Sequence, residues 1–109
     1  IIQRNNRDLK KCEECLKTLE RQGVKEVAVL GMEGMAETFF ALSIDGTPRI
    51  KAVFDSRGFT SFHGIPVYPV KDAKNYDGKI IITALDKVDA QMETLKAEGV
   101  ESARIVIPW

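Results

Sequence analysis

The sequence predicts an α/β fold in three layers, in which helices cover both faces of one mainly parallel sheet of five strands. Two observations lead to this expectation: short apolar runs alternate along the chain with segments of helical periodicity, and the connections between them are short. Parallel strands joined through helices form right-handed crossovers with few exceptions, and the strand order expected for such a sheet is 3-2-1-4-5.

Size and charge limit the class of protein. The chain has 109 residues, 44% of them apolar, so residues 1–109 are expected to form one domain. Basic and acidic residues cancel to a net charge of zero, so neither nucleic acid nor a membrane is an expected partner. The two cysteines favour a cytoplasmic location over a disulfide-rich secreted domain. The chain begins with Ile1, which favours a fragment of a longer protein.

An amphipathic helix is predicted at the start of the chain, over about residues 6–22. Its apolar positions recur every three or four residues, at Leu9, Cys12, Leu16 and Leu19. Gly23 tolerates the left-handed conformation that commonly ends a helix. Residues 1–23 are therefore expected to form an extra N-terminal helix, and residues 24–109 the sheet with its crossover helices.

Five short apolar runs that follow are typical of strands. They cover residues 26–31, 49–55, 65–70, 79–84 and 103–107. The third run contains two prolines that cannot donate to a ladder, which predicts a short strand at the edge of the sheet. Helical periodicity over residues 34–44 and 86–98 predicts two crossover helices, the second with Asp86 as its N-cap.

The first strand runs directly into the turn Gly31-Met32-Glu33-Gly34-Met35-Ala36. In the dinucleotide fingerprint Gly-x-Gly-x-x-Gly/Ala, the second glycine lets a pyrophosphate approach the backbone, and here Glu33 takes its place. The N–H groups of Gly31, Gly34 and Met35 are candidates for binding a phosphate, because helix N-termini favour anions. The alternative is that these small residues only serve a strand-to-helix turn.

Polar side chains follow the other strand ends, which meet at one edge of a parallel sheet. Asp55 ends the second strand, where a carboxylate either accepts hydrogen bonds from ribose hydroxyls or caps the polar loop 56–58. Arg57 is a candidate for binding the 2′-phosphate of NADP or the 3′-phosphate of coenzyme A. Thr83 and Ala84 end the fourth strand and are expected along the adenine or sugar edge of the ligand.

Three residues with reactive side chains are not expected to carry chemistry. Cys12 and Cys15 have the spacing of half a zinc site, but no second pair exists, so both are expected to be reduced, metal-free packing residues. His63 lies near Ser61, but no strand-to-helix elbow presents a nucleophile there. No catalytic residue and no metal ligand is predicted, and the domain is expected not to be an enzyme in isolation.

Taken in order, the glycine turn, Asp55, the segment Gly64-Ile65-Pro66-Val67 and the Ile-rich run 79–84 resemble the Rossmann-like domains of bacterial polysaccharide-biosynthesis proteins, over about residues 24–107. These include N-terminal domains of sugar acyltransferases and nucleotide-binding domains joined to sugar transferases. The resemblance implies a Rossmann-like sandwich and a site for NAD(P), coenzyme A or a nucleotide sugar at the glycine turn. Other domains of the same protein are the macromolecular partners that the resemblance implies, and a homo-oligomer is the alternative expectation.

Two functional hypotheses follow from these observations. In the first, the chain is a nucleotide- or CoA-binding module of sugar-nucleotide or polysaccharide metabolism. In the second, which Glu33 favours, it is a degenerate domain that binds no nucleotide and serves in oligomerisation or in docking a catalytic partner. A small NAD-dependent oxidoreductase is a weaker third hypothesis, because no Tyr-x-x-x-Lys pair accompanies the turn.

Overall fold

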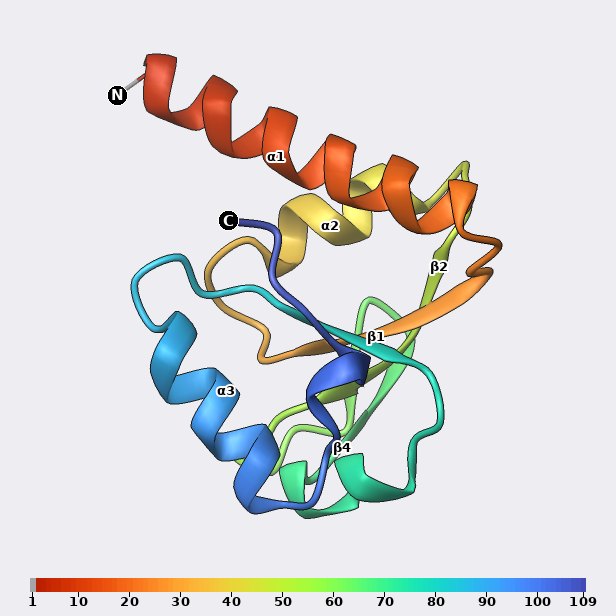
Figure 1. Ribbon diagram of the computed structural model, residues 1–109, viewed down its shortest axis with the longest axis vertical. Coiled ribbons are helices and arrows are strands. Elements are labelled where there is room, and N and C mark those ends of the chain that lie inside the picture. Colours follow the sequence, from red (N-terminus) through yellow and green to blue (C-terminus); the bar gives the residue numbers. More distant parts are fainter. Residues whose placement is uncertain (1) are drawn as a thin grey trace.

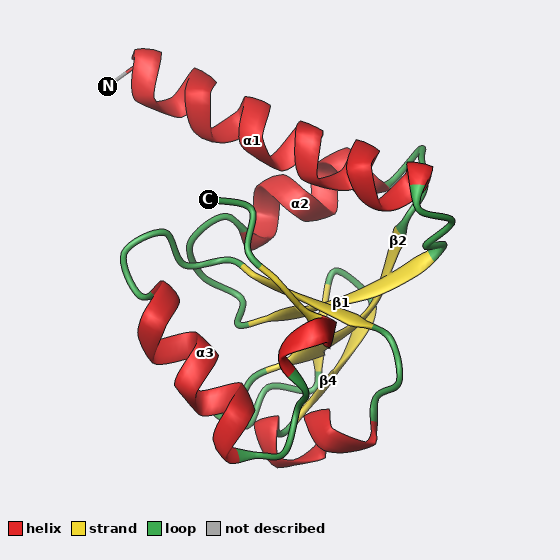
Figure 2. Cartoon of the chain, viewed as in Figure 1, coloured by secondary structure: helices red, strands yellow, loops and turns green. Residues whose placement is uncertain are grey.

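A computed structural model describes the backbone of residues 2–109 and the side chains from Arg7 onward. It confirms the α/β class: one sheet lies between two groups of helices (Figure 1; Figure 2). Within this described part of the chain, no helix combines the length and the apolar character that crossing a membrane requires.

The sheet has six strands. They are β1 (Glu26–Leu30), β2 (Arg49–Phe54), β3 (Ser61–Phe62), β4 (Ile65–Tyr68), β5 (Lys79–Ile82) and β6 (Ile105–Val106). Their order in the sheet is β3-β4-β2-β1-β5-β6, and all neighbours are parallel except β3 and β4. The prediction of a five-stranded sheet in the order 3-2-1-4-5 is therefore wrong: an antiparallel strand, β3, lies beyond the expected edge strand.

The additional strand belongs to a tight hairpin. Ser61 pairs with Pro66 and Phe62 with Ile65, and between the two pairs His63 and Gly64 have φ angles of 51° and 83°. Two-residue hairpin turns of this kind need positive φ at both positions, which Asn-Gly supplies far more readily than His-Gly. A two-residue strand with an unusual turn residue leaves little signal in a sequence, which explains why the strand was not predicted.

Three α-helices and two 3-10 helices complete the fold. They are α1 (Ile2–Arg21), α2 (Ala36–Ser43), η1 (Val70–Asn75), α3 (Val88–Ala97) and η2 (Ser102–Arg104). The expected end of α1 is confirmed: Gly23 has a φ of 83°, and the N–H of Val24 donates to the carbonyl of Leu19 at 3.0 Å. The predicted N-cap Asp86 is wrong, because Lys87 occupies that position without a side-chain cap bond.

Apolar side chains fill both sides of the sheet. Odd-numbered residues of β1, Val27 and Val29, face the cluster beneath α1 and α2, whereas Ala28 and Leu30 face the cluster beneath α3 and η1. Burial on both faces explains why the strand reads as one continuous apolar run. Figure 1 shows α1 and α2 on one side of the strands, and α3 with η1 on the other.

The topology places one crevice at the carboxyl ends of the central strands. From β1 the chain first builds β2 and β4 on one side, and it then returns to build β5 and β6 on the other. The strand order thus reverses between β1 and β5. In open α/β sheets, ligands bind outside the strand ends at this point.

Candidate functional site

A cavity of about 340 Å³ lies at the carboxyl ends of β1, β2 and β5. Seven of the eight residues predicted from the sequence line it: Gly31, Glu33, Gly34, Asp55, Arg57, Thr83 and Ala84. Four further lining residues were not predicted: Met32, Asp86, Lys87 and Gln91. The eighth predicted residue, Met35, is not among the lining residues. The structure therefore brings most of the predicted set together around one hollow.

Gly31 is a glycine because of its backbone conformation. Its φ is 84°, and its N–H donates to the carbonyl of Phe54 at 2.8 Å, which fixes the turn after β1. A Cβ atom here would lie 3.6 Å from Nε2 of Gln91 and 3.8 Å from Oγ1 of Thr83, which are ordinary contact distances. The N–H of Gly31 is thus used inside the fold and is not available for a phosphate.

Gly34 is a glycine because the turn packs tightly on the end of β5. A Cβ atom at Gly34 would lie 2.6 Å from the carbonyl oxygen of Thr83 and 3.2 Å from Cα of Ala84. In the same contact, the N–H of Met35 donates to the Thr83 carbonyl at 3.0 Å. Met35 therefore uses its N–H to join two loops, and we leave it out of the candidate site.

Two backbone donors of the turn stay open to an anion. Within the described chain, the N–H groups of Glu33 and Gly34 have no acceptor in the protein, whereas the backbone of Met32 helps to lower the pKa of the Asp55 carboxyl. Both open donors belong to residues that line the cavity, and they lie just before Met35, the N-cap of α2. Unpaired N–H groups before a helix favour a negatively charged ligand group.

Asp55 is buried, with 8% of its surface exposed, and it is held by Arg57. Arg57 donates from Nε to Oδ1 at 3.0 Å and from Nη2 to Oδ2 at 2.8 Å, and its backbone N–H also bonds to Oδ1 at 3.0 Å. These bonds from Arg57 hold the pKa of the Asp55 carboxyl below its ordinary value. Asp55 was predicted either to bind ribose hydroxyls or to cap the loop 56–58. The structure contains the bonds that cap this loop.

Arg57 also contacts a second carboxylate. Its Nη1 lies 3.2 Å from Oε2 of Glu33, and its guanidinium carbon lies 5.5 Å from the centre of the Phe59 ring. The side chain of Glu33 is 78% exposed and that of Arg57 is 47% exposed, so the pair sits at the outer edge of the site. Glu33 therefore does not face the cavity as an uncompensated charge.

Two polar side chains, those of Thr83 and Gln91, tie the end of β1 to the loop after β5. Thr83 donates its hydroxyl to the carbonyl of Leu30 at 2.7 Å. Gln91, on α3, accepts from the N–H of Ala84 at 3.3 Å and donates to the same Leu30 carbonyl at 3.5 Å. A glutamine inside a helix carries no signal of its own in a single sequence. Gln91 was therefore not predicted as a residue of the site.

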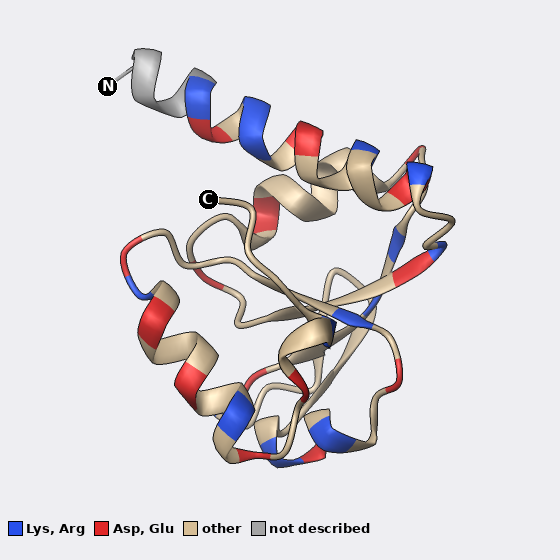
Figure 3. Cartoon of the chain, in the orientation of Figure 1, with Lys and Arg blue, Asp and Glu red and all other residues tan. Residues whose placement is uncertain are grey.

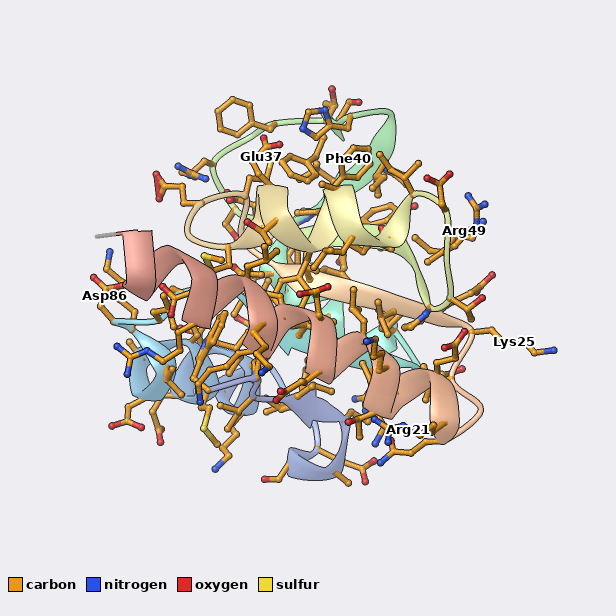
Figure 4. The ribbon with its side chains drawn as sticks, turned by 90° about the horizontal axis from the view of Figure 1, so that it is seen from above. Arg21, Lys25, Glu37, Phe40, Arg49 and Asp86 are labelled. Carbon is orange, nitrogen blue, oxygen red and sulfur yellow. The ribbon has the colours of Figure 1, made fainter. Side chains whose placement is uncertain are left out.

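Other reactive residues lie away from this cavity. Nε2 of His63 is 2.6 Å from Oε1 of Glu37, and the His63 ring stacks on Phe40 with centroids 4.4 Å apart. In Figure 4, Glu37 and Phe40 lie on α2, apart from Asp86, which lines the cavity. Among the side chains that the structure describes, no three His, Cys, Asp or Glu residues are grouped to hold a metal ion.

A larger cavity, of about 440 Å³, lies between α1 and the edge strand β6. Its lining residues include the apolar or weakly polar Cys15, Leu19, Val106 and Ile107 and the basic Lys11 and Lys79. None of the residues predicted from the sequence to bind a ligand lies there. This hollow is therefore separate from the candidate site.

Charges of both signs are mixed over the chain. Figure 3 shows basic and acidic residues interleaved along α1 and α3. At the cavity, Glu33, Asp55 and Asp86 stand beside Arg57 and Lys87. A ligand there meets cations and anions at close range, so its orientation depends on which of its groups carries charge.

Comparisons with protein-family models, with curated proteins and with solved structures gave no match for this chain. The resemblance to domains of polysaccharide-biosynthesis proteins therefore stays a prediction from the sequence. Any assignment of function has to start from the geometry of the cavity.

Proposed function

We propose that the chain is a nucleotide-binding module, not catalytic by itself, whose site is the cavity at the ends of β1, β2 and β5. The observation that carries this proposal is the position of that cavity, where the strand order reverses, together with the glycine turn and the acidic residue that line it. The finer assignment of the fold as a Rossmann-like sandwich belongs to the same proposal. The parallel β1, β2 and β5, with helices on both faces, support it.

The size of the cavity bears on the ligand. Small-molecule sites commonly measure about 300–1,000 Å³, and this one, at about 340 Å³, is at the lower end. One nucleotide unit of NAD(P), of coenzyme A or of a nucleotide sugar fits such a volume better than a whole dinucleotide. The remainder of a larger ligand would extend beyond the cavity.

The phosphate and the ribose of a nucleotide each have candidate partners in the lining. The N–H groups of Glu33 and Gly34 are donors for a phosphate, and Lys87 and Arg57 supply positive charge. Asp55 is the candidate for a ribose hydroxyl: each carboxylate oxygen has two lone pairs, so bonds from Arg57 leave further acceptor capacity. A cytoplasmic role in sugar-nucleotide metabolism, within a longer protein or an oligomer, is proposed on the sequence resemblance alone.

Ligand-induced stabilisation tests this proposal directly. In thermal denaturation with NAD, NADP, coenzyme A and a UDP-sugar, a ligand at about 100 times its Kd adds about 2.7 kcal/mol and raises Tm by about 10 °C or more. Lys87→Gln is expected to lower the affinity for the ligand that raises Tm about two- to fivefold. Lys96→Gln, in the last turn of α3 and outside the lining, should leave that ligand's affinity unchanged. If no nucleotide raises Tm, the proposal is wrong.

A partner-docking role is the second candidate function, and specific observations favour it. The N–H groups of Gly31 and Met35 and the carboxylate of Asp55 are already bonded within the protein, and Glu33 stands where a pyrophosphate would approach a glycine. Sedimentation of the purified chain distinguishes the two. Self-association without any nucleotide-induced rise in Tm supports docking, whereas a monomer stabilised by a nucleotide contradicts it.

A further inference from the structure

The ion pair between Glu33 and Arg57 spans residues of the two loops that follow β1 and β2. The Nη1 of Arg57 and Oε2 of Glu33 are 3.2 Å apart. Both residues line the same cavity as the open N–H groups of the glycine turn. The carboxylate of Glu33 thus occupies the outward side of the one arginine in the lining.

We propose that the Glu33 carboxylate is an internal occupant of the anion position on Arg57, and that a phosphomonoester group of the nucleotide replaces it when the ligand binds. This rests on the proposed nucleotide-binding function. It assigns Glu33 a regulatory role in that site: the side chain competes with the ligand and selects for ligands that carry a strongly anionic terminal phosphate.

The two carboxylates that contact Arg57 are bound unequally. Asp55 holds Nε and Nη2 through three side-chain contacts between 2.8 and 3.2 Å, and its side chain is only 6% exposed. Glu33 has a single contact, to Nη1, and its side chain is 78% exposed. Asp55 therefore fixes the guanidinium, and Glu33 is the partner that can leave.

The energy of the exchange also favours displacement of Glu33. An exposed ion pair contributes little net stability, because water and salt screen it and both side chains lose freedom. A phosphomonoester carries close to two negative charges and binds arginine through charge-assisted hydrogen bonds. It therefore displaces Glu33 at low cost, whereas a neutral nucleoside has no group that competes for Nη1.

Arg57 is held ready for this exchange after Glu33 has left. Asp55 still accepts hydrogen bonds from Nε and Nη2 of the guanidinium. The ring of Phe59 lies 5.5 Å from the guanidinium carbon. The positive charge consequently stays at the cavity rather than turning into solvent. No rearrangement of the sheet or of α2 is required.

Titration calorimetry with AMP and adenosine, on wild type and Glu33→Gln, tests the proposal. Glu33→Gln is expected to bind AMP about two- to fivefold more tightly and to bind adenosine as wild type does. Glu93→Gln removes one negative charge from α3 outside the lining and serves as the matched control, with no change for either ligand. An increase in AMP affinity that Glu93→Gln reproduces would contradict a specific role for Glu33.

The Arg57→Lys background separates exchange from simple repulsion. Lysine keeps the positive charge but lacks the fork that contacts two carboxylates at once. If Glu33 competes for Arg57, Glu33→Gln gains less AMP affinity in the Arg57→Lys protein than in wild type. An equal or larger gain there overturns the exchange and leaves only long-range repulsion.

The failure of this proposal differs from the failure of the nucleotide-binding function. If wild type binds AMP and Glu33→Gln binds it no more tightly, the exchange is wrong but the nucleotide-binding function stands. Absence of AMP binding by wild type and by Glu33→Gln, in proteins with unchanged thermal melts, overturns the exchange. If NAD, NADP, coenzyme A and a UDP-sugar also fail to bind, the nucleotide-binding function is wrong as well.

Discussion

At the scale of single residues, the carboxylate of Asp55 contributes charge-dependent stability to the turn after β2. Its pKa is lowered in the folded protein, mainly by the hydrogen bonds from Arg57. A carboxyl group with a lowered folded-state pKa stabilises the protein above its unfolded pKa, which is about 4. That contribution disappears as the pH falls through the lower, folded-state value.

We therefore expect Asp55→Asn to lower the free energy of unfolding by about 1–2 kcal/mol at pH 7, because hydrogen bonds from a cation to a buried carboxylate are lost. Below about pH 4 the difference from wild type should shrink. Urea denaturation at several pH values measures it. Asp77→Asn, at an exposed loop position, is the control and should cost little at any pH. A pH-independent loss for Asp55→Asn would refute the electrostatic explanation.

A second residue-scale prediction compares two glycines with positive φ. Gly34 (φ 64°) has the Thr83 carbonyl 2.6 Å from an added Cβ, whereas Gly58 (φ 90°) has nothing within 4 Å. Both alanine variants carry the cost of the left-handed conformation, about 1–2 kcal/mol. Gly34→Ala should cost at least about 1 kcal/mol more, because backbone has to move. Equal losses of unfolding free energy for the two variants in chemical denaturation would show that the backbone around Gly34 moves at no cost.

How far residue roles could be predicted from the sequence depends on where their partners lie. The spacing of Gly31, Gly34 and Asp55 along the first two strands is local, and the structure places all three at the cavity. The partner of the Met35 N–H is the carbonyl of Thr83, far along the chain, so its engagement could not be read from the turn. Gln91 reaches the site only because α3 starts beside the strand ends.

At the scale of elements, α1 contacts the sheet through one face, and its two cysteines lie differently on that face. Cys12 is fully buried, and burial raises the pKa of its thiol to about 12. Cys15 is half-buried at the rim of the helix contact, and burial raises the pKa of its thiol to about 11. Both thiols are therefore protonated near neutral pH, where only the thiolate reacts.

We expect native protein to react slowly with an aromatic disulfide reagent at pH 7.5, with Cys15 modified first. Cys12 should react only when α1 detaches, and both should react at the rate of an ordinary thiol in denaturant. Absorbance kinetics on Cys12→Ser and Cys15→Ser, each retaining one thiol, assign the two rates. Fast labelling of the Cys15→Ser protein would mean that α1 opens readily.

That these thiols bind no metal stays a prediction, which elemental analysis of the purified chain would check.

The elements that could be predicted from the sequence are those with several periodic residues. α1 has four apolar positions in register and a glycine after its end, and its expected end agrees with the structure. β6 was expected over residues 103–107 but contains only Ile105 and Val106, because Ala103 and Arg104 form the 3-10 helix η2. Short elements of this kind are set by tertiary contacts rather than by local preference.

At the scale of the whole molecule, Trp109 anchors the end of the chain beneath α1. Its ring lies 6.2 Å from that of Phe39, centroid to centroid, and it packs on the cluster that contains Leu16 and Val29. Figure 1 shows the C-terminal segment running back beside α2. The Nε1 atom is buried without a hydrogen-bond partner among the described residues.

Trp109→Ala is accordingly expected to lower the free energy of unfolding by about 2 kcal/mol, because it removes a large half-buried ring. Trp109→Phe should cost less than about 1 kcal/mol, since it keeps an aromatic ring and removes a donor that has no partner. Denaturation followed by circular dichroism compares the three proteins. A Phe variant as unstable as the Ala variant would mean that the indole N–H is satisfied after all.

The overall architecture could be predicted to the level of class but not of the complete sheet. Continuous apolar runs such as Val27 to Leu30 require burial on both faces, which a three-layer arrangement supplies. The hairpin that adds β3 is held by contacts outside its own sequence, including the stacking of His63 on Phe40. Such pairing between a loop and a distant helix has no periodic signature.

The pairing of β1 also sets the order in which the molecule is completed during synthesis. One edge of β1 pairs with β2 and the other with β5, so Val27 can meet Lys79 only after β2, β3 and β4 have been synthesised. Until then, that edge of β1 has unpaired N–H and carbonyl groups, and the faces that pack on Ile81 and Val106 are uncovered. A chain that lacks β5 and β6 leaves this edge and this part of the core uncovered, and we expect it to be prone to aggregate.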